Sequence, residues 1–196
     1  MGLALLSCTI WGACRSSSRS GDSFEILGPS DETTDAGMVV QEANAELQKI
    51  KVLYKQNENK REEIKKALES NDAAEVKRIT DDVVQIFNEG FDSGRIAVDK
   101  IAQAEDMNVN DDYKEYLRLK EEALRKQMEA FEEYRQAART LRDNYDPKNV
   151  ANREKVKADF TARSENYRKL MEKARDLSKQ ANEIAKDALR KQAEQQ

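Results

Sequence analysis

Histidine is absent from this chain of 196 residues. Its absence removes the commonest general base and the commonest metal ligand of proteins, and a di-iron bundle site needs Glu-x-x-His pairs. Both cysteines, Cys8 and Cys14, lie within the first fourteen positions, so the rest of the chain has no thiolate nucleophile and no cysteine-based zinc site. Phosphate-binding loops and nucleophile elbows are missing as well. We therefore expect a protein that is not an enzyme, with no catalytic residue, no metal and no cofactor.

Helix-breaking residues are also scarce, because the chain contains only 2 Pro and 7 Gly. Charged residues make up 37% of the sequence and hydrophobic residues 38%, whereas an ordinary globular domain carries about 25% charged residues. This composition favours long, solvent-exposed helices over a compact mixed fold. The length predicts one folded domain.

The first fourteen residues, MGLALLSCTIWGAC, contain an apolar stretch of 12 residues from Gly2 to Ala13. A bilayer-spanning helix needs about 20 residues, whereas the apolar core of a signal peptide has about 7–15. Gly12 and Ala13 are small residues that directly precede Cys14, and a polar run follows. This segment resembles the precursor of a bacterial lipoprotein, in which such a cysteine becomes the lipidated first residue of the mature protein.

The resemblance implies that residues 1–14 are a signal peptide and that Cys14 carries a lipid anchor. The mature protein would then be membrane-anchored in the bacterial cell envelope, facing the periplasm or the exterior. Leu5-Leu6-Ser7-Cys8 is the alternative match, and it would make Cys8 the lipidated residue.

Residues 15–36 are rich in Ser, Gly and Asp, which predicts a flexible linker. A flexible chain of this length has a root-mean-square reach of about 25 Å. We expect it to tether a helical domain, residues 37–196, to the membrane.

Apolar residues recur at three- and four-residue steps in four segments, which is the spacing of amphipathic helices. The first of these stripes is interrupted near Asn57 and Arg61. The segments have similar lengths and short connections, which favours an antiparallel up-down four-helix bundle; a three-helix, spectrin-like coiled coil with two segments fused is the alternative. The expected helices are 37–70, 72–106, 110–145 and 147–193.

The breaks between the segments carry helix-start signals. Asp72 followed by Glu75 resembles a capping box. Asn110 precedes two acidic residues that suit the positive end of a helix dipole. Asp146-Pro147 predicts an N-cap followed by a first-turn proline.

Two glycines, Gly90 and Gly94, stand inside the second expected helix, where each costs about 1 kcal/mol relative to alanine. Their spacing places both on one face. They predict either close packing against a neighbouring helix or a hinge with a ligand pocket. Aromatic residues at helical spacing are interpreted as core.

Charge is unevenly distributed along the chain. Residues 72–106 contain 4 basic and 9 acidic residues, a net −5, and residues 147–196 contain 13 basic and 8 acidic residues, a net +5. Two explanations fit this pattern. Oppositely charged helices attract each other within the bundle, or the basic last helix contacts an anionic envelope surface. Nucleic acid is not expected as a partner, since the sequence pI is about 5.2.

Together these features predict a membrane-tethered helical bundle that acts by binding or scaffolding, with a protein or an envelope surface as partner. The alternative is a chaperone-like or lipid-binding bundle that shields an apolar ligand between helices, with a cavity near Gly90 and Gly94. A scaffold should instead have a solid core.

Overall fold

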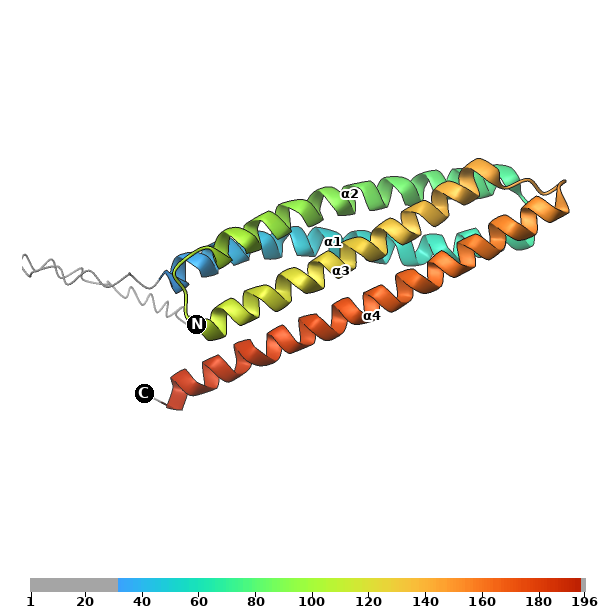
Figure 1. Ribbon diagram of the computed structural model, residues 1–196. Helices are drawn as coiled ribbons and strands as arrows, with labels where there is room; N and C mark the ends of the chain where they lie inside the picture. Colours follow the sequence, from blue (N-terminus) through green and yellow to red (C-terminus); the bar gives the residue numbers. More distant parts are fainter. Residues whose placement is uncertain (1–31, 195–196) are drawn as a thin grey trace, which may run out of the picture.

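The computed structural model describes residues 32–194, and all regular secondary structure in this part of the chain is helical. Four antiparallel helices follow one another along the sequence and form an up-down bundle (Figure 1). This confirms the predicted four-helix bundle, and no two of the segments are fused as the spectrin-like alternative required. The helices are α1 (Thr33–Glu69), α2 (Ala73–Glu105), α3 (Asp111–Asn144) and α4 (Val150–Glu194).

Helix α1 begins four residues earlier than the sequence predicts. Its start is held against the α2–α3 connection, because the Glu32 amide donates to the Asn108 carbonyl at 2.9 Å and the Glu32 carboxylate accepts from the Asn108 amide at 2.8 Å. Ala36, in the first turn, is completely buried. These tertiary contacts extend the helix into the segment expected to be linker.

The α1–α2 turn is made by a residue in the left-handed region. Asn71 has φ 55°, a conformation that asparagine adopts more readily than most residues. The Asp72 amide then donates back to the Ala67 carbonyl at 3.0 Å, which satisfies one of the last carbonyls of α1.

Two of the predicted helix starts are confirmed. The Asp72 side chain accepts from the Glu75 amide at 3.0 Å, and the Asn110 side chain accepts from the Tyr113 amide at 2.9 Å. The capping box is only half formed, because the Glu75 carboxylate binds Arg78 at 2.6 Å instead of returning to the helix start.

The predicted start of α4 at Asp146-Pro147 is wrong, because α4 begins three residues after the proline. Asn149 is the capping residue, and its side chain accepts from the Asn152 amide at 3.1 Å. The Asp146 side chain instead accepts from the Lys148 amide at 2.9 Å, which closes a local turn. The Asp146 carboxylate therefore stabilises the turn between α3 and α4 and does not cap α4.

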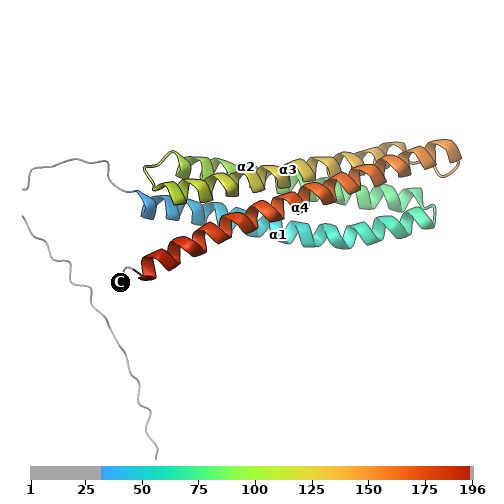
Figure 2. The ribbon, with the colours of Figure 1, turned by 60° about the horizontal axis from the view of Figure 1, so that its bottom comes forward.

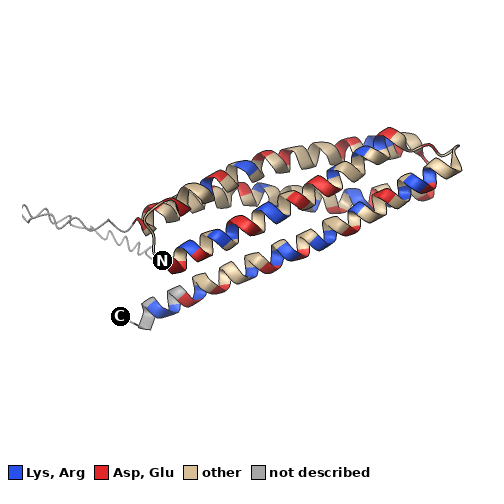
Figure 3. Cartoon of the chain, in the orientation of Figure 1, with Lys and Arg blue, Asp and Glu red and all other residues tan. Residues whose placement is uncertain are grey.

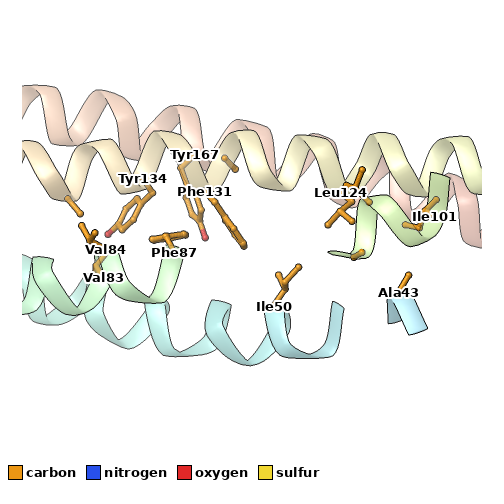
Figure 4. Close-up of a cluster of buried hydrophobic side chains, with 14 of the residues drawn as sticks. Ala43, Ile50, Val83, Val84, Phe87, Ile101, Leu124, Phe131, Tyr134 and Tyr167 are labelled. Carbon is orange, nitrogen blue, oxygen red and sulfur yellow. The ribbon is translucent and has the colours of Figure 1, made fainter. Parts of the chain in front are cut away.

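Aromatic side chains from three helices meet in the middle of the core (Figure 4). The ring of Phe87 on α2 lies 5.0 Å from Phe131 and 5.4 Å from Tyr134, both on α3, and 6.2 Å from Tyr167 on α4. All four residues are buried. The interpretation of the aromatic residues as core is therefore correct at these positions, where edge-to-face pairs add to apolar burial.

The helices pack in the order of the chain, α1 with α2, α2 with α3, and α3 with α4. Helix α4 lies along α3, whereas α1 and α4 do not pack along their lengths (Figure 1, Figure 2). Within the described residues, ion pairs join α1 to α2, as Lys60 to Asp82 at 2.9 Å, and α3 to α4, as Lys191 to Asp112 at 2.8 Å, but none joins α1 to α4. One side of the bundle is consequently left open.

Candidate ligand-binding site

The space between α1 and α4, floored by α3, is the candidate site, and we call it the open seam. It runs along α1 from Leu47 to Glu69, about 33 Å at ~1.5 Å per residue. Three cavities lie in it, with volumes of about 770, 300 and 150 Å³. Because α3 lies behind all three, the site exists only where α1 and α4 fail to close on each other.

Near its middle, the seam is bridged by a group that we call the Arg61 cluster: Asn57 and Arg61 of α1, Tyr134 of α3 and Tyr167 of α4. The Arg61 guanidinium carbon lies 5.9 Å from the ring centre of Tyr134 and 5.8 Å from that of Tyr167. These distances are within the range of cation–π attraction. A cation over two rings therefore links α1 to α4 here.

Three polar side chains of the Arg61 cluster are buried, namely Asn57, Tyr134 and Tyr167. Burial raises the pKa of the Tyr134 and Tyr167 hydroxyls well above the ordinary value, and nearby Arg61 opposes the shift. Asn57 is completely buried and lies near the Tyr167 hydroxyl. A buried amide and two buried hydroxyls therefore stand where α1, α3 and α4 meet, and such groups need hydrogen-bond partners to offset the cost of their burial.

On one side of the Arg61 cluster, towards the C-terminal end of α1, lies the cavity of about 770 Å³. Its charged lining is balanced, with three basic and three acidic side chains. They are Arg61, Lys65, Lys157, Glu58, Glu62 and Glu69. This part of the seam favours neither sign of ligand charge.

On the other side lies a pair of adjoining cavities of about 300 and 150 Å³, both lined by Leu47, Gln127 and Ser178. We call this pair the lysine end of the seam. Its apolar lining includes Leu47 and Tyr54 of α1 and Met171 of α4. Its charged lining consists of Lys51, Lys120 and Arg175, and among the described residues no Asp or Glu lines it.

Lys120 is the most enclosed of these cations. Its ammonium nitrogen lies 5.6 Å from the ring centre of Tyr116, and burial lowers its pKa below the ordinary value. Within the described part of the chain it has neither an ion pair nor a hydrogen bond. A half-buried cation with no anionic partner is costly, and an anionic ligand would offset that cost.

Gly90 and Gly94 lie away from the open seam, on the face of α2 that packs against α3. A β-carbon at Gly90 would be 3.0 Å from a ring atom of Phe131, and one at Gly94 would be 3.0 Å from Met128. This geometry supports the close-packing interpretation. The ligand cavity expected near these glycines is absent from the described hollows, which lie between α1 and α4 instead.

The remaining predicted residues add little to this site. Cys14 and Cys8 lie outside the described residues, as do the linker residues before Glu32. The described residues include no group of three or more His, Cys, Asp or Glu side chains placed to hold a metal ion. No helix among them is both long and apolar enough to cross a membrane.

The excess positive charge of the last helix is partly neutralised within the helix itself. Arg168 binds Glu165 at 2.7 Å and Glu172 at 2.6 Å. Basic and acidic residues alternate along much of α4 (Figure 3). This pairing leaves less positive charge on α4 for an anionic surface than the sequence count suggests.

Sequence reasoning did not identify the Arg61 cluster or Lys120 as site residues. The interruption of the first apolar stripe near Asn57 and Arg61 was the available signal, since polar residues at core-facing positions need a structural or functional reason. Lys120 carried no such signal, because a lysine on an amphipathic helix ordinarily faces solvent.

Comparison of the chain with protein-family models, with curated proteins and with solved structures gave no match.

Proposed function

We propose that this chain is a non-catalytic binding protein of the bacterial cell envelope that shields the apolar part of a ligand in the open seam. Of the two functions that the sequence suggests, a scaffold and a bundle that covers an apolar ligand, the second fits the geometry better. A scaffold has no need of a hollow, whereas α1 and α4 leave one between them in which an apolar ligand can be covered.

The observation that carries the proposal is the set of apolar side chains left partly uncovered in the seam. Leu47, Tyr54 and Met171 pack against the core on one side only. They line a cavity of about 300 Å³, which is at the lower limit of typical small-molecule sites. Covering these side chains with an apolar ligand removes their surface from water, which is favourable in proportion to the area covered.

The envelope location is part of the same proposal and depends on the lipoprotein-like N-terminus. A lipid on Cys14, or on Cys8, would hold the bundle within linker reach of a membrane surface. The membrane would then be a source of apolar ligands.

Binding of N-phenyl-1-naphthylamine, a neutral apolar fluorophore whose emission rises in apolar surroundings, tests the proposal on the full chain. Ser178 lines both cavities of the lysine end and is exposed, so Ser178→Phe fills the hollow without entering the core. Gln180→Phe is the matched control, because Gln180 is exposed two residues further along α4, on a different face.

We expect saturable binding to the native chain. Ser178→Phe should weaken it at least about fivefold, corresponding to about 1 kcal/mol of lost contact, while Gln180→Phe leaves it within about twofold. Circular dichroism confirms that both variants are folded. No saturable binding, or equal affinities for the two variants, would contradict the proposal.

A further inference from the structure

We infer that the ligand of the lysine end is a single-chain amphiphile with a carboxylate head, the chemistry of a long-chain fatty acid. The carboxylate lies beside Lys120 in the smaller cavity, and the chain extends along Leu47 and Tyr54 in the larger one. This inference rests on the proposed function and adds the chemical class of the ligand.

The charged side chains that line the lysine end favour an anionic ligand. The three cations there have no carboxylate among the described residues that line the hollow, whereas the opposite end of the seam carries equal numbers of each sign. Ion pairs elsewhere are plentiful; Lys126, on the same helix as Lys120, binds Glu129 at 2.7 Å. Lys120, by contrast, is half-buried and has no ion-pair partner among the described residues.

The polar lining of the smaller cavity suits a carboxylate. Besides the Lys120 ammonium, the side-chain amides of Gln127 and Asn182 line it, and both can donate hydrogen bonds. A single negative charge matches the one half-buried cation. Lys51 and Arg175 are exposed and lie where the hollow meets solvent, so they add attraction at longer range.

The dimensions select a single chain. The cavities of about 150 and 300 Å³ follow one another between α1 and α4, the first with the enclosed cation and the second with Leu47, Tyr54 and Met171. A helix with its side chains is about 10–12 Å across, which is wider than hollows of this size accommodate. An acidic helix from a partner protein is therefore disfavoured, and it becomes one outcome of the test.

Calorimetric titration of the full chain with dodecanoate, dodecan-1-ol and dodecyltrimethylammonium distinguishes the contribution of the head group from that of the alkyl chain. The two ionic amphiphiles are used below their micelle concentrations and the alcohol below its solubility limit. We expect dodecanoate to bind about tenfold or more tightly than the alcohol, because a charge-assisted hydrogen bond is added, and the cationic amphiphile to bind most weakly. Lys120→Met should remove the preference for dodecanoate while leaving alcohol binding within about twofold. Lys120→Arg should retain the preference.

Lys114→Met is the matched control, because Lys114 is an exposed lysine on the same helix and lines none of the three cavities. Equal binding of dodecanoate and dodecan-1-ol would overturn the carboxylate inference but leave the proposed function standing. Equal effects of Lys114→Met and Lys120→Met would overturn it as well. So would an acidic amphipathic peptide that binds the chain and is not displaced by dodecanoate. Binding by none of the three amphiphiles would contradict the proposed function too.

Discussion

Replacing Gly90 and Gly94 with alanine is expected to change the stability of the bundle in opposite directions. Both glycines lie inside α2, where alanine is favoured over glycine by about 1 kcal/mol through backbone entropy. Both would also place a β-carbon 3.0 Å from an atom of α3, which is too close for either neighbour to stay where it is. The sign of each change depends on whether that neighbour can move.

At Gly90 the neighbour is the ring of Phe131, which is 2% exposed and packs edge-on against Phe87 at 5.0 Å. Shifting such a ring disturbs the middle of the core, and overpacking of this kind costs about 1–3 kcal/mol. Gly90→Ala should therefore lower the free energy of unfolding by about 1 kcal/mol after the gain in helix propensity is subtracted.

At Gly94 the neighbour is Met128, an unbranched side chain that is only partly buried and has three rotatable bonds. Its Cγ and Sδ must each shift by a few tenths of an ångström, which a partly buried side chain accommodates more cheaply than a buried ring, so Gly94→Ala should keep part of the propensity gain and raise the free energy of unfolding by about 0.5 kcal/mol.

Thermal unfolding followed by far-ultraviolet circular dichroism measures the difference. At about 2–4 °C per kcal/mol for a domain of this size, the two variants should melt about 3–6 °C apart, with Gly90→Ala below the native protein. If Gly90→Ala instead melts with or above Gly94→Ala, Phe131 yields as readily as Met128, and the reasoning from side-chain rigidity is refuted.

Three further predictions concern charge, capping and export. Lys120→Met should raise the free energy of unfolding near neutral pH, because the native chain holds a half-buried cation there without a partner. Folding lowers the Lys120 pKa below 10.5, so between the lowered value and 10.5 the unfolded chain binds more protons than the folded one, and native stability rises with pH in that window. The advantage of the variant should therefore be constant well below the window and shrink as pH rises through it towards 10.5. Urea titrations in which the advantage stays unchanged up to 10.5 would contradict this. Asn149→Ala should destabilise the protein by about 1 kcal/mol in urea unfolding, whereas Asp146→Ala should cost less, since Asn149 caps α4; the reverse order would restore Asp146 as the cap. Mass spectrometry of the membrane fraction should find a diacylglycerol-modified Cys14, or Cys8 if the alternative match is the true one, and a soluble, unmodified chain that retains Met1 would reject the lipoprotein resemblance.

The sequence by itself determined the number of helices, their approximate limits and two of their three predicted caps. These features depend on local chemistry: apolar spacing, the scarcity of Gly and Pro, and side chains that accept hydrogen bonds from the next turn. Asp72 and Asn110 cap the helices that they precede for this reason. The third prediction, at Asp146, was wrong because two nearby polar residues, Asp146 and Asn149, could each accept such a bond, and the path of the connection decided between them.

Only the tertiary structure decided which pair of neighbouring helices fails to close. An apolar stripe shows that a helix has a buried face, but not which partner covers it or how completely. The open seam arises from the relative placement of α1 and α4, and residues far apart in the chain, such as Leu47, Lys120 and Arg175, line its adjoining cavities. Whether a lysine has a carboxylate beside it depends on three helices at once, and this is why Lys120 could not be recognised from its own segment.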